Sequence, residues 1–175
     1  NIDRGIFSVY FFNLVEVKPG QAVFQDAGVP HAYLEGQNVE IMANSDNVLR
    51  GGLTPKHVDV PELLKHLRLE PTVPRIIQGS PAEKYVAVFP TPAPDFELSR
   101  LQLAGGQELD LVSISAQIFI VMEGSVEVAE KDAGAFTRKK GEAWISFDGA
   151  RSTLKALEDA VIYRAGAGKQ IVDGG

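Results

Sequence analysis

The chain has 175 residues, of which 45% are hydrophobic and 23% charged, and a formal net charge of −6. This is the composition of a globular protein with enough apolar side chains for a substantial core. The acidic balance argues against nucleic acid as a partner, because the sequence shows no basic stripe. The absence of cysteine excludes disulfides, thiolate nucleophiles and thiolate metal sites, so any metal must be held by histidine, carboxylate or amide groups.

No apolar run approaches the roughly 20 residues that a membrane-spanning helix needs. The longest run, residues 118–122, has the length of a strand. No basic and then apolar leader opens the chain, so the sequence predicts a cytoplasmic protein without a membrane partner. The chain starts at Asn1 without a methionine and runs directly into strand-like sequence, which indicates a segment of something longer.

The first residues indicate strands joined by a tight turn. Residues 7–17 are rich in aromatic and β-branched side chains, so we expect one or two largely buried strands there. Residues 18–20, Lys-Pro-Gly, predict a turn, because proline presets φ and glycine accepts the left-handed conformation. We expect the return strand at 21–24.

The segment from Pro30 to Arg50 concentrates polar side chains around a short apolar run. We expect a bend before His31, which then begins a strand with Tyr33 two residues on. Residues i and i+2 of an extended chain share a face, so these two side chains would point into one cavity. For a lone histidine, a buried and hydrogen-bonded structural role is the alternative.

The rest of this segment predicts a turn at 34–38, a strand at 39–42 and an irregular loop at 43–54. Two glycines follow Arg50 in the loop, and they let the backbone turn sharply or approach a ligand closely. A loop of this kind on a strand scaffold is where functional residues concentrate.

Residues 59–67 predict a helix. Asp59 can cap it, Pro61 suits its first turn, and Glu62 completes a pattern that resembles a capping box. The leucines of this segment supply an apolar stripe.

The second half of the chain predicts a different organisation. Residues 69–83 are proline-rich and lack periodicity, which predicts a linker. Eight short strands between residues 85 and 164 are separated by turn residues, a pattern typical of an antiparallel sandwich or barrel. The basic cluster at 138–140 is interpreted as part of a solvated turn.

One internal match links the two halves. Residues 18–24 and 139–145 each place a turn ending in glycine before a small residue and a bulky apolar pair. Extending this alignment sets His31 against Ser152. The match predicts two related β-barrel units, of which the first keeps a metal-capable side chain; a chance match is the alternative.

Residues 30–36, Pro-His-Ala-Tyr-Leu-Glu-Gly, followed by residues 39–56, closely resemble type I mannose-6-phosphate isomerase, as does the opening at 3–7. The match runs almost unbroken from Asp3 to Leu67. The resemblance implies a mainly β fold of cupin-type, double-stranded β-helix barrels (jelly rolls), with one short helix between the units. It also implies one zinc ion.

On this basis we divide the chain into four parts. They are 1–68, the C-terminal part of a catalytic barrel with its following helix; 69–83, the linker; 84–166, a second and structural barrel; and 167–175, a tail.

The resemblance also assigns roles to single residues. It implies that His31 is a zinc ligand and that Arg50 lies over the reacting carbons of the sugar. Asp46, four residues before Arg50, would orient that arginine or act on a proton itself, and we group the two as catalytic. The residues expected to line the same pocket and bind substrate are Tyr33, Glu40 and Lys56.

Interconverting mannose 6-phosphate and fructose 6-phosphate moves a proton between C1 and C2 through an enediol. That step needs a general acid/base and a positive group at the oxygen where charge develops. Zinc would act as a Lewis acid, and Arg50 adds a permanent cation with a rigid donor fork. Which side chain moves the proton is left open.

One histidine cannot hold zinc, which takes three or four protein ligands in most sites. The resemblance places the remaining ligands and the phosphate site upstream, so the expected partners are a sugar phosphate and the N-terminal part of the same enzyme. The alternative function is a non-catalytic cupin, a sugar-binding or sensor module. A metal-dependent oxygenase is disfavoured, because residues 31–33 lack its compact ligand set.

Overall fold

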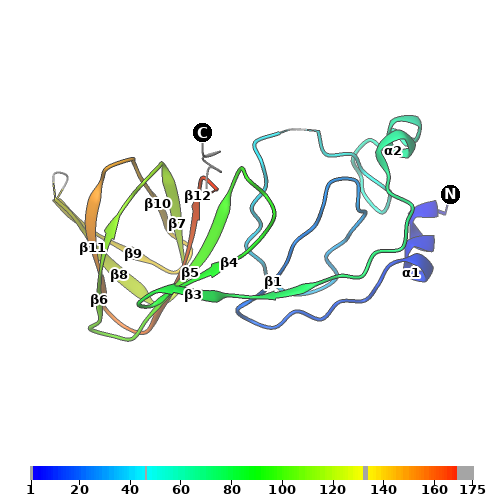
Figure 1. Ribbon diagram of the computed structural model, residues 1–175. Coiled ribbons are helices and arrows are strands. Elements are labelled where there is room, and N and C mark those ends of the chain that lie inside the picture. The colour runs from blue at the N-terminus through cyan, green and yellow to red at the C-terminus, as the bar shows by residue number, and fades with distance from the viewer. Residues whose placement is uncertain (1, 46, 132–133, 169–175) are drawn as a thin grey trace. The chain divides into compact units, whose positions relative to one another are not determined.

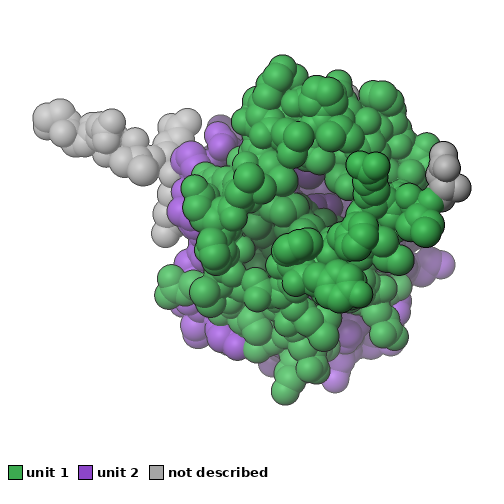
Figure 2. All heavy atoms as spheres, turned by 90° about the vertical axis from the view of Figure 1, so that its right-hand side faces the viewer, with its two compact units in different colours: residues 1–38, 44–76 green, residues 39–43, 77–175 purple. Residues whose placement is uncertain are grey.

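The computed structural model describes residues 2–45, 47–131 and 134–168. Strands hold 38% of these residues and helices 9%, so the fold is mainly β, as the sequence predicts. The chain divides into two compact units: residues 1–38 with 44–76, and residues 39–43 with 77–175 (Figure 2). None of the described helices is long and apolar enough to cross a membrane.

The elements follow the order shown in Figure 1. Up to residue 76 they are η1 (Arg4–Phe7), α1 (Ser8–Phe11), β1 (Gln21–Val23) and α2 (Val60–His66), followed at the unit boundary by β2 (Ile76–Gln78). The second unit contains β3 (Ser80–Glu83), β4 (Val86–Phe89), β5 (Glu97–Leu103), β6 (Glu108–Val112), β7 (Gln117–Glu123), β8 (Ser125–Glu130), β9 (Gly134–Lys139), β10 (Ala143–Ser146), β11 (Arg151–Ala156) and β12 (Ala160–Gly166).

The prediction of buried strands at 7–17 is wrong. A 3₁₀ turn, η1, leads into one turn of α-helix, α1, and no residue of either is buried. Asp3 caps η1, because its side chain accepts a hydrogen bond from the backbone N–H of Gly5. A β-branched and aromatic composition marks a strand only where a neighbouring strand pairs with it, and residues 7–17 pair with none in the described chain.

The strands predicted at His31 and at 39–42 are also absent, since both segments are irregular. The turn at 34–38 is present as a bend in which Gly36 has φ 109°. The predicted return strand after Gly20 forms as β1.

The predicted helix is confirmed as α2. The carboxylate of Asp59 accepts a hydrogen bond from the N–H of Glu62 at 3.0 Å, and Pro61 lies in the first turn. Both groups act within one turn of helix, so this element depends on local sequence.

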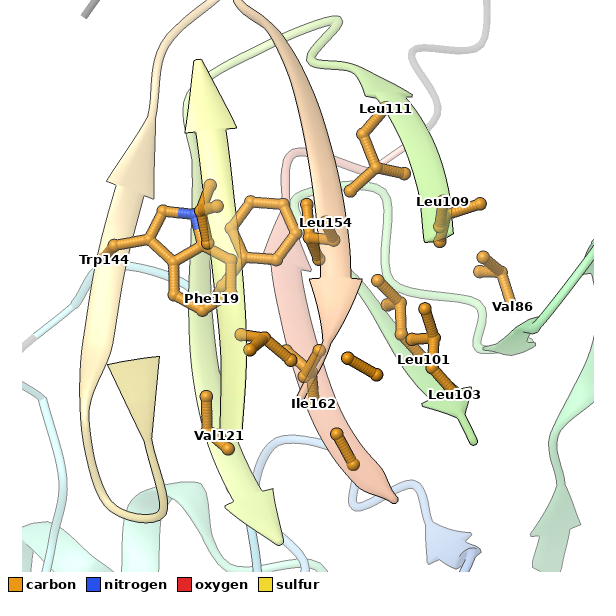
Figure 3. Close-up of a cluster of buried hydrophobic side chains, with 14 residues drawn as sticks. Val86, Leu101, Leu103, Leu109, Leu111, Phe119, Val121, Trp144, Leu154 and Ile162 are labelled. Carbon is orange, nitrogen blue, oxygen red and sulfur yellow. The ribbon is translucent and has the colours of Figure 1, made fainter. Parts of the chain in front are cut away.

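The second unit consists of two antiparallel sheets. One has the strand order β10-β7-β12-β5-β4-β3 and the other β6-β11-β8-β9. Residues from the facing sides of these strands form the core, in which Leu101, Leu154 and Ile162 are fully buried. Phe119 and Trp144 stack with their ring centroids 4.6 Å apart (Figure 3). All eight strands predicted between residues 85 and 164 are present.

The sequence missed three strands. β2 and β3 lie inside the predicted linker 69–83, and Pro81 is tolerated there because β3 is the edge strand of its sheet. β9 contains Arg138 and Lys139 of the basic cluster, so only Lys140 lies in the turn. β9 is also an edge strand, where charged side chains are common because they discourage further pairing.

The predicted internal match corresponds to a shared turn. In residues 18–21 and 139–142 the third residue is a glycine, with φ 82° and 86°. The backbone N–H of the fourth residue, Gln21 or Glu142, donates to the carbonyl oxygen of the first, Lys18 or Lys139. The side chain of the fourth residue in turn accepts a hydrogen bond from the backbone N–H of the first, at 2.8 Å and 2.9 Å respectively. Residues 104–107 repeat this pattern, with φ 82° at Gly106 and a 2.8 Å side-chain bond. Among the described residues the turn therefore occurs at three places, one more than the sequence indicated.

Candidate functional site

His31 lies in an irregular, exposed segment directly after Pro30. Its Nδ1 is 3.1 Å from the carbonyl oxygen of Val29. A carbonyl oxygen only accepts hydrogen bonds, so Nδ1 carries the hydrogen when this bond is made, and in the neutral imidazole Nε2 then has the lone pair. Metal-ligating histidines commonly take this arrangement, because the bond at one nitrogen fixes the tautomer and the ring direction. In this chain His31 is exposed, whereas the structural alternative expected it to be buried.

Tyr33 lies beside His31. Their ring centroids are 5.9 Å apart at an interplanar angle of 65°, which is an edge-to-face contact. The sequence predicted that the two side chains share a face because of strand geometry. The structure brings them together without a strand, and leaves Tyr33 64% exposed.

Arg50 and Lys56 lie in the glycine-containing loop of the first unit, and both are exposed. Neither side chain forms an ion pair with a residue that the structure describes. The backbone N–H of Lys56 donates to the hydroxyl of Thr54 at 3.2 Å, which orders the turn before it. Two cations on one loop, with no ion-pair partner among the described residues, offer positive charge to an anionic ligand.

The remaining predicted site residues have different positions. Glu40 belongs to residues 39–43, which cluster with the second unit. Asp46 lies outside the described residues. The structure thus joins His31 to Tyr33 and places Arg50 and Lys56 on one loop; the roles predicted for all six residues stay predictions.

The described residues do not complete a zinc site. They contain no group of three or more histidine, cysteine, aspartate or glutamate side chains that could hold a metal ion. His31 offers one suitable nitrogen, and zinc in proteins takes three or four ligands. Further ligands would have to come from outside these residues.

Sequence reasoning missed one residue that organises this loop. The carboxylate of Asp3 accepts hydrogen bonds from the N–H groups of Gly5 and Leu53, at 2.7 and 2.8 Å. The second bond crosses 50 residues of sequence. Asp3 and Gly5 belonged to the opening segment that supported the family resemblance, but their partner could not be read from local sequence.

The antiparallel sheets of the second unit, with the recurring glycine turn, define the class of protein as a cupin-type β protein, and the predicted fold class is confirmed. No family model matches the chain. Curated relatives do match it, and they are named mannose-6-phosphate isomerase. The protein of Bos taurus is 38% identical over 93% of this chain, and that of Homo sapiens is 40% identical over 93%.

Solved structures give the same result. A histidine-to-alanine variant of phosphomannose isomerase from Salmonella typhimurium matches 73% of this chain with 32% sequence identity and a TM-score of 0.60. The predicted resemblance to mannose-6-phosphate isomerase is therefore confirmed. The chain spans about two fifths of the length of the two curated relatives (41%) and 32% of the Salmonella chain.

Proposed function

We propose that this chain is the C-terminal portion of a zinc-dependent isomerase that interconverts mannose 6-phosphate and fructose 6-phosphate through an enediol, in the cytoplasm. The observation that carries the proposal is the similarity to proteins named mannose-6-phosphate isomerase, which extends over 93% of this chain. The contacts of His31, Tyr33 and the Arg50 loop are compatible with that chemistry.

A second observation supports the assignment of individual residues. The solved variants of the Salmonella enzyme include alanine replacements of a histidine, a glutamate and an arginine. Along that chain these three residues are separated by the same numbers of positions as His31, Glu40 and Arg50 are here. We infer that the three correspond to His31, Glu40 and Arg50, which supports a functional role for each of these residues in the complete enzyme.

In this proposal His31 supplies one zinc ligand through Nε2, and its bond to the Val29 carbonyl selects the neutral tautomer in which that nitrogen carries no hydrogen. When bound, zinc would act as a Lewis acid toward substrate oxygens. The described residues hold only this one ligand, so we derive no catalytic step through the metal.

The cations of the loop have roles that do not depend on zinc. Arg50 is always charged and offers paired donors, so it suits an oxygen on which negative charge develops during enediol formation. Lys56 would bind an anionic or hydroxyl oxygen of the sugar phosphate, and Tyr33 would cover the sugar beside His31. Asp46 would orient Arg50 or carry a proton; the general acid/base is not assigned.

We further propose that the partner of this chain is the N-terminal part of the same enzyme. In the described chain up to residue 76 no side chain is buried, and large apolar groups are exposed, including Tyr10 at 79%, Phe11 at 81% and Leu14 at 86%. Apolar side chains exposed on this scale indicate an interaction surface. The N-terminal part would cover them and would bring the remaining zinc ligands and the phosphate site.

Zinc titration tests this proposal. Isothermal calorimetry of this chain alone should show weak or no stoichiometric zinc binding, and the chain alone should have negligible isomerase activity. The chain joined to the upstream segment should bind one zinc and interconvert the two sugar phosphates. Tight one-to-one binding by the chain alone would overturn the proposal that its metal site is incomplete.

Arg50→Ala in the joined protein tests the role of the loop. We expect turnover to fall by about 100-fold or more, as for loss of one donor to a developing oxyanion, with little change in the melting temperature. Arg75→Ala, which removes an exposed arginine outside the site, is the matched control and should keep full activity. An unchanged turnover number for Arg50→Ala would remove Arg50 from the mechanism.

A non-catalytic, sugar-binding cupin is the second candidate. It is favoured by the lack of a complete metal-binding group among the described residues. Such a module would bind mannose 6-phosphate with the same affinity before and after zinc chelation. An isomerase with the proposed site would lose affinity or turnover when the metal is removed.

A further inference from the structure

We propose that Asp3 is a positioning residue, which fixes the loop carrying Arg50 and Lys56 by anchoring it at Leu53. The functional part of this inference rests on the function proposed above for Arg50 and Lys56. The anchor itself is a structural claim that can be tested without any activity.

Both oxygens of the Asp3 carboxylate are engaged. Oδ2 accepts from the Leu53 N–H at 2.8 Å, and Oδ1 accepts from the Gly5 N–H at 2.7 Å. Hydrogen bonds to an ionised carboxylate are stronger than those between neutral groups. One side chain thus joins two backbone segments that lie 50 residues apart.

Two glycines allow these segments to approach each other. A Cβ added at Gly52 would lie 2.9 Å from both Asp3 Oδ1 and Gly5 Cα, and one added at Gly5 would lie 3.0 Å from Gly52 Cα. A larger residue at either position would push the segments apart. Gly51, the neighbouring position, has no atom within 4 Å of an added Cβ, so the constraint is specific to Gly5 and Gly52.

Leu53 has a backbone conformation that needs an external anchor. Its φ is 51°, in the left-handed region that non-glycine residues seldom occupy. Its side chain is 64% exposed, so burial does not hold it in place. Uncommon conformations of this kind persist where the surrounding structure enforces them, and the bond to Asp3 does so directly.

The anchor lies at the centre of the functional loop. Leu53 follows Arg50 by three residues and precedes Lys56 by three, so neither Cα can be more than about 11 Å from it. Their side chains have no ion-pair partner within the described chain that would hold them instead. Loss of the anchor would let both cations move away from the substrate, and displacements of about 1 Å can cost large factors in rate.

The structural test uses the whole chain and amide hydrogen exchange at Leu53, followed by NMR. Asp3→Ala should accelerate exchange of the Leu53 N–H, and Asp3→Asn, which keeps one acceptor oxygen, should have a smaller effect. Arg4→Ala and Gly51→Ala are the matched controls and should leave it unchanged. Unaltered exchange in Asp3→Ala would overturn the anchor.

The functional test uses the chain joined to the upstream segment. Asp3→Ala should lower kcat about 10-fold or more with a smaller change in KM. In an Arg50→Ala, Lys56→Ala background the same change should have almost no further effect, because the residues that Asp3 positions are already gone. A full and additive loss in that background would show that Asp3 acts elsewhere.

The outcomes separate the two proposals. Suppose that Asp3→Ala alters the Leu53 exchange rate, but that turnover is unchanged in both Asp3→Ala and Arg50→Ala. This result would support the anchor and overturn the proposed role of the loop. If Asp3→Ala fails to fold, Gly52→Ala supplies the second variant, since it should separate the same segments without removing the carboxylate.

Discussion

The two units of this protein use the same turn but continue from it in different ways. After Gly141 the chain enters β10, which pairs with β7 over four residues and buries Trp144 in the core. After Gly20 it enters β1, which has three residues, and the described residues between β1 and α2 are irregular. A turn of this type begins a strand, but only neighbouring strands can extend it.

The same contrast appears in burial. Phe119, Leu101 and Leu154 of the second unit have at most 1% of their surface exposed. In the described chain up to residue 76 no side chain reaches that level of burial, although its sequence is equally rich in aromatic residues. Aromatic content alone therefore does not predict which side chains are buried within this chain.

The largest difference in stability is expected between replacing a buried aromatic residue of the second unit and replacing an exposed one of the first. Phe119→Ala should lower the free energy of unfolding by about 3–5 kcal/mol, because it removes a fully buried ring and leaves a cavity. Phe11→Ala, at a ring that is 81% exposed, should change it by less than about 0.5 kcal/mol. Urea unfolding of the whole chain measures both. Equal losses would mean that the first unit has a core of its own.

A smaller effect is expected at the shared turn. Gly141→Ala should destabilise the second unit by about 1 kcal/mol, because its φ of 86° disfavours any residue with a Cβ. No atom lies within 4 Å of an added Cβ there, so the cost is conformational and not steric. Gly51→Ala, in open space without a positive φ, should be nearly neutral. Thermal unfolding compares the two, and a neutral Gly141→Ala would show that the turn does not constrain the strand.

The smallest effect concerns α2, the most locally determined element. Hydrogen bonds from Lys65 and His66 hold the pKa of the Glu62 carboxyl below its ordinary value. Because the pKa of Glu62 is lower in the folded than in the unfolded chain, the ionised carboxylate stabilises the fold. This stabilisation is fully present above the pKa that Glu62 has in the unfolded chain, and it is lost as the pH falls through the pKa of the folded state. NMR titration should show the Glu62 pKa rising toward its ordinary value in Lys65→Met. An unchanged pKa would show that the Lys65 contact does not persist in solution.

Much of the second unit was predictable from sequence. Short apolar stretches separated by glycine turns predicted all eight strands expected between residues 85 and 164, and the capping pattern at Asp59 predicted α2. Edge strands β3 and β9 were missed because proline and paired basic residues also mark loops. In the candidate site, the rings of His31 and Tyr33 do make contact, but the strand from which the sequence predicted their shared direction does not form.

Sequence was sufficient for the features that depend on a few neighbouring residues, namely the turns and the helix cap. Its motif also determined the resemblance to mannose-6-phosphate isomerase. The three-dimensional fold was needed to establish which aromatic residues are buried, because burial depends on the strands that cover them. It also decided that Asp3 meets Leu53, because a bond across 50 residues leaves no signal in local sequence.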